Sequence, residues 1–214
     1  MNLAGSHIHF LVSSSNKCIE GVPGFSFTLG ERGALQACEG KAKSLSLDLY
    51  AQWKGLDASG QFRFTPPTHA LLAFRQALRE HGVEGGCEGR LGRYTDNYHT
   101  LLRGMKELGF FPYVPPPTSG SIITTFLVPN DPRFDFDTTY RGLASRGFVI
   151  YPGKTTKADS FRMGSIGQLF KKDMEELVAA LKEVLVEQGV ALPVVQKGEK
   201  VEFKHGKERG FIVH

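Results

Sequence analysis

The sequence predicts a mixed fold of helices and strands, built in two unequal parts. Its 214 residues, 41% hydrophobic and 22% charged, can bury a sizeable core. The second half alternates apolar stripes at helical spacing with β-rich runs, in the order helix, strand, helix, strand, strand, helix. The first half offers only two clear strands, and two strands do not make a stable large sheet alone. We therefore expect an α+β layer in the second half and an incomplete first half.

Charge, cysteine content and hydropathy exclude several classes of protein. The net charge of +4 is mild and its positive residues are scattered, which argues against a nucleic-acid-binding protein. Three cysteines, Cys18, Cys38 and Cys87, match neither a metal template nor a disulfide framework, as is usual in a reducing compartment. Residues 1–10 lack the pattern of a signal peptide, and no apolar run is long enough to cross a bilayer. We expect a cytoplasmic protein with no metal and no membrane contact, although a targeting segment upstream of Met1 would not be visible here.

The first half is organised around a lysine in a loop. Residues 7–12 alternate apolar side chains with others, which predicts a strand, and residues 25–30 do the same. Between them lie the small and polar residues 13–21, which contain Lys17, and a Pro-Gly turn. We expect the two strands to form a short ladder with the lysine at their connection.

A lysine at the end of a strand can act as a nucleophile toward a carbonyl group. A ligand can reach it there, and a loss of solvent contact disfavours the ammonium form of the side chain. The alternative is an ordinary solvated loop residue, because local features alone do not distinguish the two.

A helix is expected to begin at two consecutive prolines, Pro66 and Pro67. Thr65 fits an N-cap and Pro66 fits the first helical position, and Leu71, Phe74 and Leu78 share one helical face. A helix N-terminus with a threonine hydroxyl can bind an anion. The alternative is that Thr65 only caps the helix.

A glycine-rich and charged stretch, residues 84–92, predicts a turn or hinge and a domain boundary. The elements expected elsewhere are a helix or loop at 31–40, a helix or irregular segment at 44–53, helices at 93–108, 134–145 and 168–188, and strands at 122–128, 148–151 and 161–167. Arg162 lies in the last strand, where a charged side chain faces either solvent or a cleft.

Five stretches of the sequence occur in a characteristic order: Ser13–Phe25, Ser44–Trp53, Arg63–His69, Gly147–Lys154 and Phe161–Gly167. Together they resemble the C-terminal portion of members of the 2-aminoethylphosphonate–pyruvate transaminase family. These proteins are class V aminotransferases of pyridoxal-phosphate fold type I. The resemblance runs from about His7 to about Gly189, and a lysine followed by Cys-Ile-x-Gly-Val-Pro-Gly-Phe is its most specific motif.

The resemblance implies a role for each of three residues. Lys17 matches the lysine that binds pyridoxal 5′-phosphate as a Schiff base and then shuttles a proton. Thr65 matches a threonine at the cofactor phosphate, reached across the interface of a homodimer. Arg162 matches the arginine that binds the anionic group of the substrate, and a guanidinium suits a carboxylate bidentately; the alternative for Arg162 is a surface ion pair.

The implied reaction moves the amine of 2-aminoethylphosphonate to pyruvate, giving phosphonoacetaldehyde and L-alanine in phosphonate catabolism. The implied fold is a truncated fold type I: residues 1–88 form the last strands and helices of the large cofactor-binding domain, 89–190 form the small α+β domain, and 191–214 form a polar tail without a counterpart. The glycine-rich phosphate cup and other cofactor contacts of this family precede the lysine and are not in this sequence. We therefore expect a fragment that is inactive alone.

Two alternatives remain open from the sequence. One is a related class V enzyme of the alanine–glyoxylate or serine–pyruvate type. The other is a non-catalytic fragment that pairs with a full-length partner through the same dimer surface.

Overall fold

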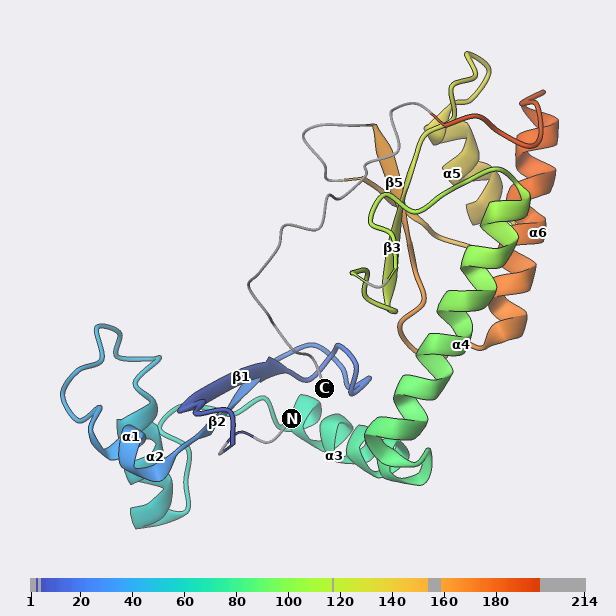
Figure 1. Ribbon diagram of the computed structural model, residues 1–214. Coiled ribbons are helices and arrows are strands. Elements are labelled where there is room, and N and C mark those ends of the chain that lie inside the picture. Colours follow the sequence, from blue (N-terminus) through green and yellow to red (C-terminus); the bar gives the residue numbers. More distant parts are fainter. Residues whose placement is uncertain (1–2, 4, 117, 154–158, 197–214) are drawn as a thin grey trace. The chain divides into compact units, whose positions relative to one another are not determined.

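The computed structural model describes residues 3, 5–116, 118–153 and 159–196 (Figure 1). The chain divides into two compact units, Met1–Arg90 and Leu91–His214, and each is presented by itself. In the order of the chain, the helix α4 (Gly86–Glu107) begins in the first unit and continues into the second. The assignment of residues 1–88 to a large cofactor-binding domain and of residues 89–190 to a small domain stays a prediction.

The first unit contains the expected two-stranded ladder. Strand β1 (Phe10–Ser14) pairs antiparallel with β2 (Ser26–Gly30), in a register that sets Phe10 opposite Gly30 and Ser14 opposite Ser26. The loop that contains Lys17 connects the two strands, as predicted.

Three helices follow the ladder in the first unit. They are α1 (Arg32–Gln36), α2 (Leu49–Ser59) and α3 (Thr68–Val83). Asp48 caps α2, because its side chain accepts a hydrogen bond of 2.9 Å from the backbone N–H of Ala51. Helix α3 packs against β2 and the segment before it, with the ring of Phe74 5.3 Å from that of Phe25 and 5.4 Å from that of Phe27.

The predicted start of α3 is wrong by two residues. The N-cap is Pro67 rather than Thr65, and no side chain caps the helix. The physical reason is the second proline: a residue before proline is disfavoured in the helical conformation, so Pro66 cannot be the first helical residue.

The glycine-rich stretch at 84–92 is also largely helical, contrary to the prediction. Only Glu84 and Gly85 form a turn, and α4 begins at Gly86. Glycine lowers helix propensity by about 1 kcal/mol relative to alanine, but propensity is a weak preference that tertiary contacts override. The buried side chain of Arg90, just after the first turn of α4, makes such contacts.

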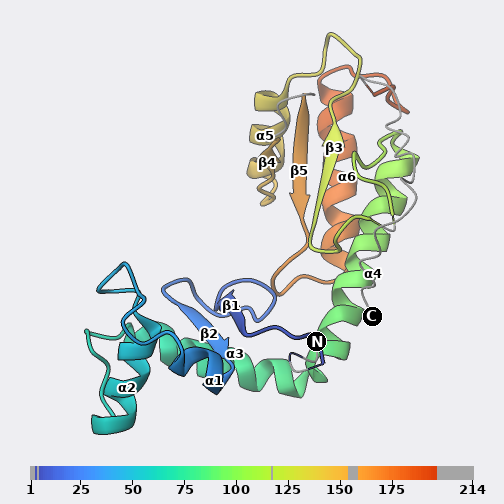
Figure 2. The same ribbon diagram turned by 60° about the vertical axis from the view of Figure 1, so that its left-hand side comes forward.

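The second unit is an α+β layer whose element order matches the prediction. Its antiparallel sheet has the order β3 (Ile123–Leu127), β5 (Ser160–Gly164), β4 (Tyr151–Pro152). Helices α5 (Phe136–Ser145) and α6 (Lys171–Glu187) lie on one face of this sheet (Figure 2).

The core of the second unit fills the space between that sheet face and the helices. Phe110, Phe126 and Phe161 are almost fully buried, with ring centroids 5.6–6.4 Å apart. Leu101 and Met105 of α4 join this core, together with apolar side chains of α5 and α6. Alternation along β5 places Phe161 and Met163 in the core and leaves Arg162 for the opposite face.

The strand predicted at 148–151 is much shorter in the structure. Phe148 donates its backbone N–H to Leu143 at 2.9 Å, so it closes the C-terminus of α5 instead of entering the sheet. Ile150 is buried, but pairing with β5 is confined to Tyr151 and Pro152.

The first residues of the predicted tail belong to the second unit. The backbone N–H of buried Val194 donates to Leu108 at 2.8 Å, and the amide of Gln196 donates to Leu127 and to Phe111 at 3.1 Å each. The rest of the predicted tail, residues 197–214, and the last residue of the stretch Gly147–Lys154 lie outside the described residues.

The described residues contain neither a candidate membrane span nor a candidate metal cluster. None of their helices combines the length and the apolar character that a membrane span requires. No group of three or more His, Cys, Asp or Glu side chains within them could hold a metal ion.

Candidate active site

Lys17 lies in the bend between β1 and β2, and its side chain is exposed. Its amine contacts no acceptor among the described residues. The backbone around it is fixed, because the N–H of Glu20 donates to the carbonyl of Lys17 at 2.8 Å and the N–H of Gly21 donates to Ser15 at 2.9 Å. The loop therefore presents a free amine from an ordered backbone.

Ser15 anchors the beginning of this loop. It is fully buried, and its hydroxyl donates to the carbonyl of Val22 at 2.7 Å. Gly21 lies close against the same segment, since a Cβ there would approach the carbonyl oxygen of Ser15 to 2.8 Å and the ring of Phe74 to 3.3 Å. These contacts join the two ends of the lysine loop to each other and to α3.

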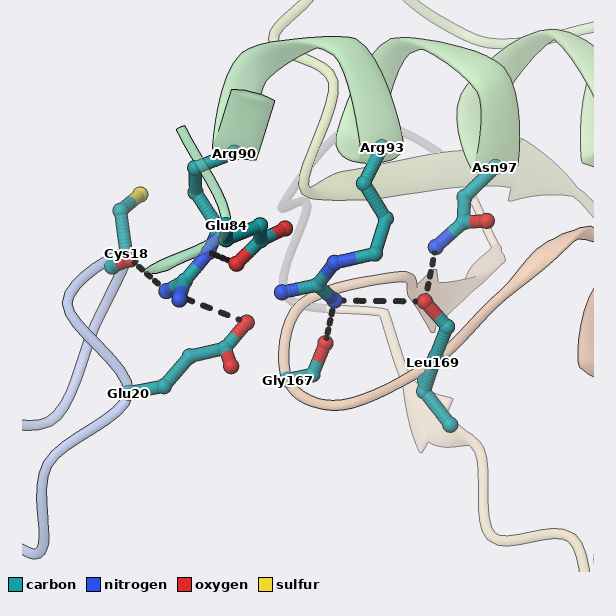
Figure 3. A network of polar contacts seen from close by, with 8 residues as sticks. All are labelled: Cys18, Glu20, Glu84, Arg90, Arg93, Asn97, Gly167 and Leu169. Atoms are coloured by element: carbon teal, nitrogen blue, oxygen red, sulfur yellow. Dashed lines mark hydrogen bonds and ion pairs between the residues drawn. The ribbon is translucent and has the colours of Figure 1, made fainter. Parts of the chain in front are cut away.

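A buried arginine contacts the loop directly after the lysine (Figure 3). Arg90 donates to the carbonyl of Cys18 at 2.7 Å and to a carboxylate oxygen of Glu84 at 2.6 Å, and it lies 3.4 Å from a carboxylate oxygen of Glu20. Its side chain is only 5% exposed. The sequence does not single out Arg90, because the glycine-rich stretch around it is typical of a turn.

Two further polar side chains on α4 bind the segment after β5 within the second unit. Arg93 donates to the carbonyl of Gly167 at 2.5 Å, and Asn97 donates to that of Leu169 at 2.7 Å (Figure 3). The spacing of Arg90, Arg93 and Asn97, three and then four residues apart, is that of one helical face and is visible in the sequence.

Thr65 lies in the extended segment before α3, and its side chain is exposed. Its hydroxyl has no partner among the described residues. The segment itself is attached to α2 and to the chain before it, because Arg63 donates from its backbone to Gln52 at 3.4 Å and from its guanidinium to the carbonyl of Leu45 at 3.2 Å. The hydroxyl of Thr65 is thus available to a ligand rather than used in a helix cap.

Arg162 is half-buried on the sheet face away from the helices. Its Nε donates to the carbonyl of Pro152 at 3.1 Å, and its guanidinium lies 6.0 Å from the ring centre of Tyr151. No carboxylate pairs with it among the described residues, so the guanidinium remains free for an anion.

Lys17 and Thr65 belong to the first unit and Arg162 belongs to the second. Their chemistry fits a ligand that carries an aldehyde and a phosphate, such as pyridoxal phosphate: a free amine attacks the aldehyde, and a free hydroxyl donates to phosphate. Within the second unit, the guanidinium of Arg162 is a cation that an anionic molecule can bind.

A separate groove of about 340 Å³ lies elsewhere in the first unit. Residues of β1, β2, α1 and α2 line it, including Phe10, Leu35, Trp53 and Leu56. Neither Lys17 nor Thr65 is part of its wall.

Comparison with curated proteins finds close relatives. The chain is 49% identical over 186 residues to a 2-aminoethylphosphonate–pyruvate transaminase of Syntrophobacter fumaroxidans, and 47% identical to one of Salmonella paratyphi B. Each match covers 86% of this chain. The chain spans about half the length of these relatives, 50% and 51% respectively, as expected for a C-terminal portion. No family model matches the sequence.

Solved structures share the fold at low sequence identity. Ureidoglycine–glyoxylate aminotransferase from Bacillus subtilis superimposes with a TM-score of 0.76 at 20% identity, over 89% of this chain and 50% of the other. Alanine–glyoxylate aminotransferase from Nostoc sp. gives 0.73 at 22%, over 86% and 49%. A PLP-bound phosphoserine aminotransferase from Trichomonas vaginalis gives 0.69 at 15%, over 85% and 49%.

Proposed function

We propose that this chain, which has the fold of class V aminotransferases and matches about half of the 2-aminoethylphosphonate–pyruvate transaminases, provides the reactive lysine and the substrate arginine of such an enzyme. The reaction moves an amine from 2-aminoethylphosphonate to pyruvate and yields phosphonoacetaldehyde and L-alanine. The chain contributes its part when the remaining half of the fold is supplied.

Lys17 has two tasks in this proposal. Its amine would hold pyridoxal phosphate covalently and, once released by the donor's amine, would take a proton from the carbon that bears that amine. The cofactor, when bound, supplies the electron sink that stabilises negative charge on that carbon. The exposed amine on a fixed backbone is the observation that carries the proposal.

Thr65 and Arg162 bind the charged groups. The hydroxyl of Thr65 donates to the cofactor phosphate, in a homodimer with the active site at the subunit interface. The guanidinium of Arg162 binds the carboxylate of pyruvate and, in the other half-reaction, the phosphonate, because both are anions with oxygens spaced for a planar fork. We further propose a cytoplasmic location, in keeping with the three free cysteines among the described residues.

Attachment of the cofactor tests the role of Lys17 directly. The purified chain is incubated with pyridoxal phosphate, reduced with borohydride, digested and mapped by mass spectrometry. We expect the added mass on Lys17 and a visible absorbance band before reduction, both lost in Lys17→Arg. Lys43→Arg removes another exposed loop lysine and serves as the matched control. Equal labelling of Lys43 and Lys17 would contradict the proposal.

The role of Thr65 is tested by affinity. Thr65→Ala should weaken cofactor binding by about ten- to a hundredfold, because a hydrogen bond to a charged group contributes about 1.5–3 kcal/mol. The melting temperature should not change, since Thr65 does not cap α3. Thr65→Ser keeps the hydroxyl and should restore the affinity.

The substrate is tested with a chimera that joins this chain to the half of the Syntrophobacter relative that this chain does not match. We expect it to transaminate 2-aminoethylphosphonate with pyruvate, and Arg162→Lys to raise the KM for pyruvate at least tenfold. The alanine–glyoxylate or serine–pyruvate alternative predicts instead a preference for alanine or serine as donor. An inactive chimera whose Lys17 still binds the cofactor would favour the non-catalytic alternative.

A further inference from the structure

Arg90 is a charged residue placed almost entirely out of solvent in the first unit. The whole residue is 4% exposed, and its three partners are the carbonyl of Cys18 and the carboxylates of Glu20 and Glu84. Burying a charge is costly unless it is paired and hydrogen-bonded. Both requirements are met here, and two of the three partners belong to the lysine loop (Figure 3).

The contacts of Arg90 fix the backbone on the C-terminal side of Lys17. Cys18 is the next residue, so the 2.7 Å hydrogen bond to its carbonyl orients the Cys18–Ile19 peptide, one peptide beyond the one that begins at the lysine. Glu20 has a φ of 62°, which is unfavourable for a residue with a side chain by about 1–2 kcal/mol. The ion pair with Arg90 favours this conformation, which also permits the 2.8 Å hydrogen bond from Glu20 to Lys17.

Only arginine can make this set of contacts. Its guanidinium has five N–H donors in a fixed plane, and Nε and Nη1 point at different partners here. A lysine at this position would keep the charge but concentrate its donors on one atom. The substitution therefore separates the charge of the residue from its geometry.

We propose that Arg90 is a positioning residue, which sets the direction in which Lys17 is presented to the cofactor. This inference rests on the proposed function of Lys17. Arg90 acts through the carbonyl of Cys18 and the carboxylate of Glu20, and we assign it no contact with cofactor or substrate.

The test compares the unsubstituted chain with Arg90→Lys. Hydrogen exchange of the Glu20 and Gly21 amides reports the order of the loop, because both amides donate within it. We expect Arg90→Lys to speed their exchange at least tenfold without changing the exchange of β2 amides. We also expect cofactor attachment at Lys17 to slow at least tenfold.

Two further variants keep the test decisive. Glu20→Gln removes the loop carboxylate while Arg90 remains, and should speed the same two amides to a smaller extent. Glu84→Gln changes the partner outside the loop and should leave cofactor attachment within about twofold of the unsubstituted chain. If Arg90→Lys speeds β2 and loop amides equally, the residue serves the stability of the whole unit and the proposal is wrong.

The two possible failures can be told apart. A chain that does not bind the cofactor at Lys17, even unsubstituted, contradicts the proposed function. A chain that binds it normally, with unchanged loop exchange in Arg90→Lys, contradicts the positioning role alone.

Discussion

Ser15 illustrates how single residues determine the shape of the lysine loop. Its hydroxyl is buried and donates to Val22, seven residues further along the chain. In the sequence it is one of three consecutive serines, and nothing there distinguishes it from Ser13 or Ser14. The buried member of the run is identified only by the folded loop, whereas the position of Lys17 between two strands was predicted from the alternation of apolar residues on either side of it.

Asp131 gives the second unit a predictable dependence on pH. Its carboxylate accepts hydrogen bonds from the guanidinium of Arg133 at 2.7 and 2.9 Å, from the backbone of Arg133 and from the backbone of Ala191. These bonds hold the pKa of Asp131 well below its usual range. In the unfolded chain the carboxyl regains a pKa of about 3.9.

We therefore expect the free energy of unfolding to fall as the pH drops below about 4, because the unfolded state binds the proton first. Above that pH the contribution of Asp131 is constant. Asp131→Asn should lower stability at pH 7 and flatten the loss below about pH 4, as measured by urea unfolding. Glu175→Gln, which removes an exposed charge on α6, should leave the acid slope unchanged.

At the scale of elements, the order of helices and strands followed from periodicity, but several ends did not. The start of α3 moved past Pro66 because Pro67 follows it, and this local rule could have been read from the sequence. The start of α4 at Gly86 could not, because its support comes from Arg90 and partners up to 72 residues away. Long-range contacts of this kind are not encoded in a window of neighbouring residues.

Two glycines of α4 should respond to alanine in opposite ways. A Cβ at Gly104 would lie 2.8 Å from a methyl group of Val178 on α6, and valine has little rotamer freedom to move away. Gly104→Ala should therefore lower the free energy of unfolding by about 1–3 kcal/mol, the usual effect of overpacking. Urea unfolding measures this change.

Gly92 is the matched control within the same helix. A Cβ there would meet nothing within 4 Å, so Gly92→Ala should raise stability by up to about 1 kcal/mol through helix propensity alone. Equal effects of the two substitutions would mean that α4 and α6 do not approach as closely as described.

At the scale of the molecule, the two units differ in how much apolar surface they bury. Of the 22 buried hydrophobic residues among those described, only Ala70 and Ala77 belong to the first unit. Twelve large hydrophobic residues of that unit are exposed, including Val12, Leu29 and Phe64. The sequence predicted two strands and no large core for the first half, and the sparse burial in the first unit agrees with that prediction.

This difference predicts unequal protection from hydrogen exchange. Amides of β1 and β2 should exchange about 100-fold faster than those in the middle of α6, because regions with few buried contacts open locally at low cost. Mass spectrometry of peptic fragments measures both in one experiment. Similar rates in the two regions would show that the first unit is stabilised by something other than burial.

The β1–β2 ladder has a consequence for handling the protein. In the described part of the chain this sheet has two strands, so each strand has one edge without a neighbour, and Val12 and Leu29 project exposed side chains beside those edges. Free strand edges recruit strands from other molecules. The isolated chain should therefore aggregate above a limiting concentration. A charged substitution on β1 such as Val12→Lys should raise that concentration, and it lies outside the lysine loop.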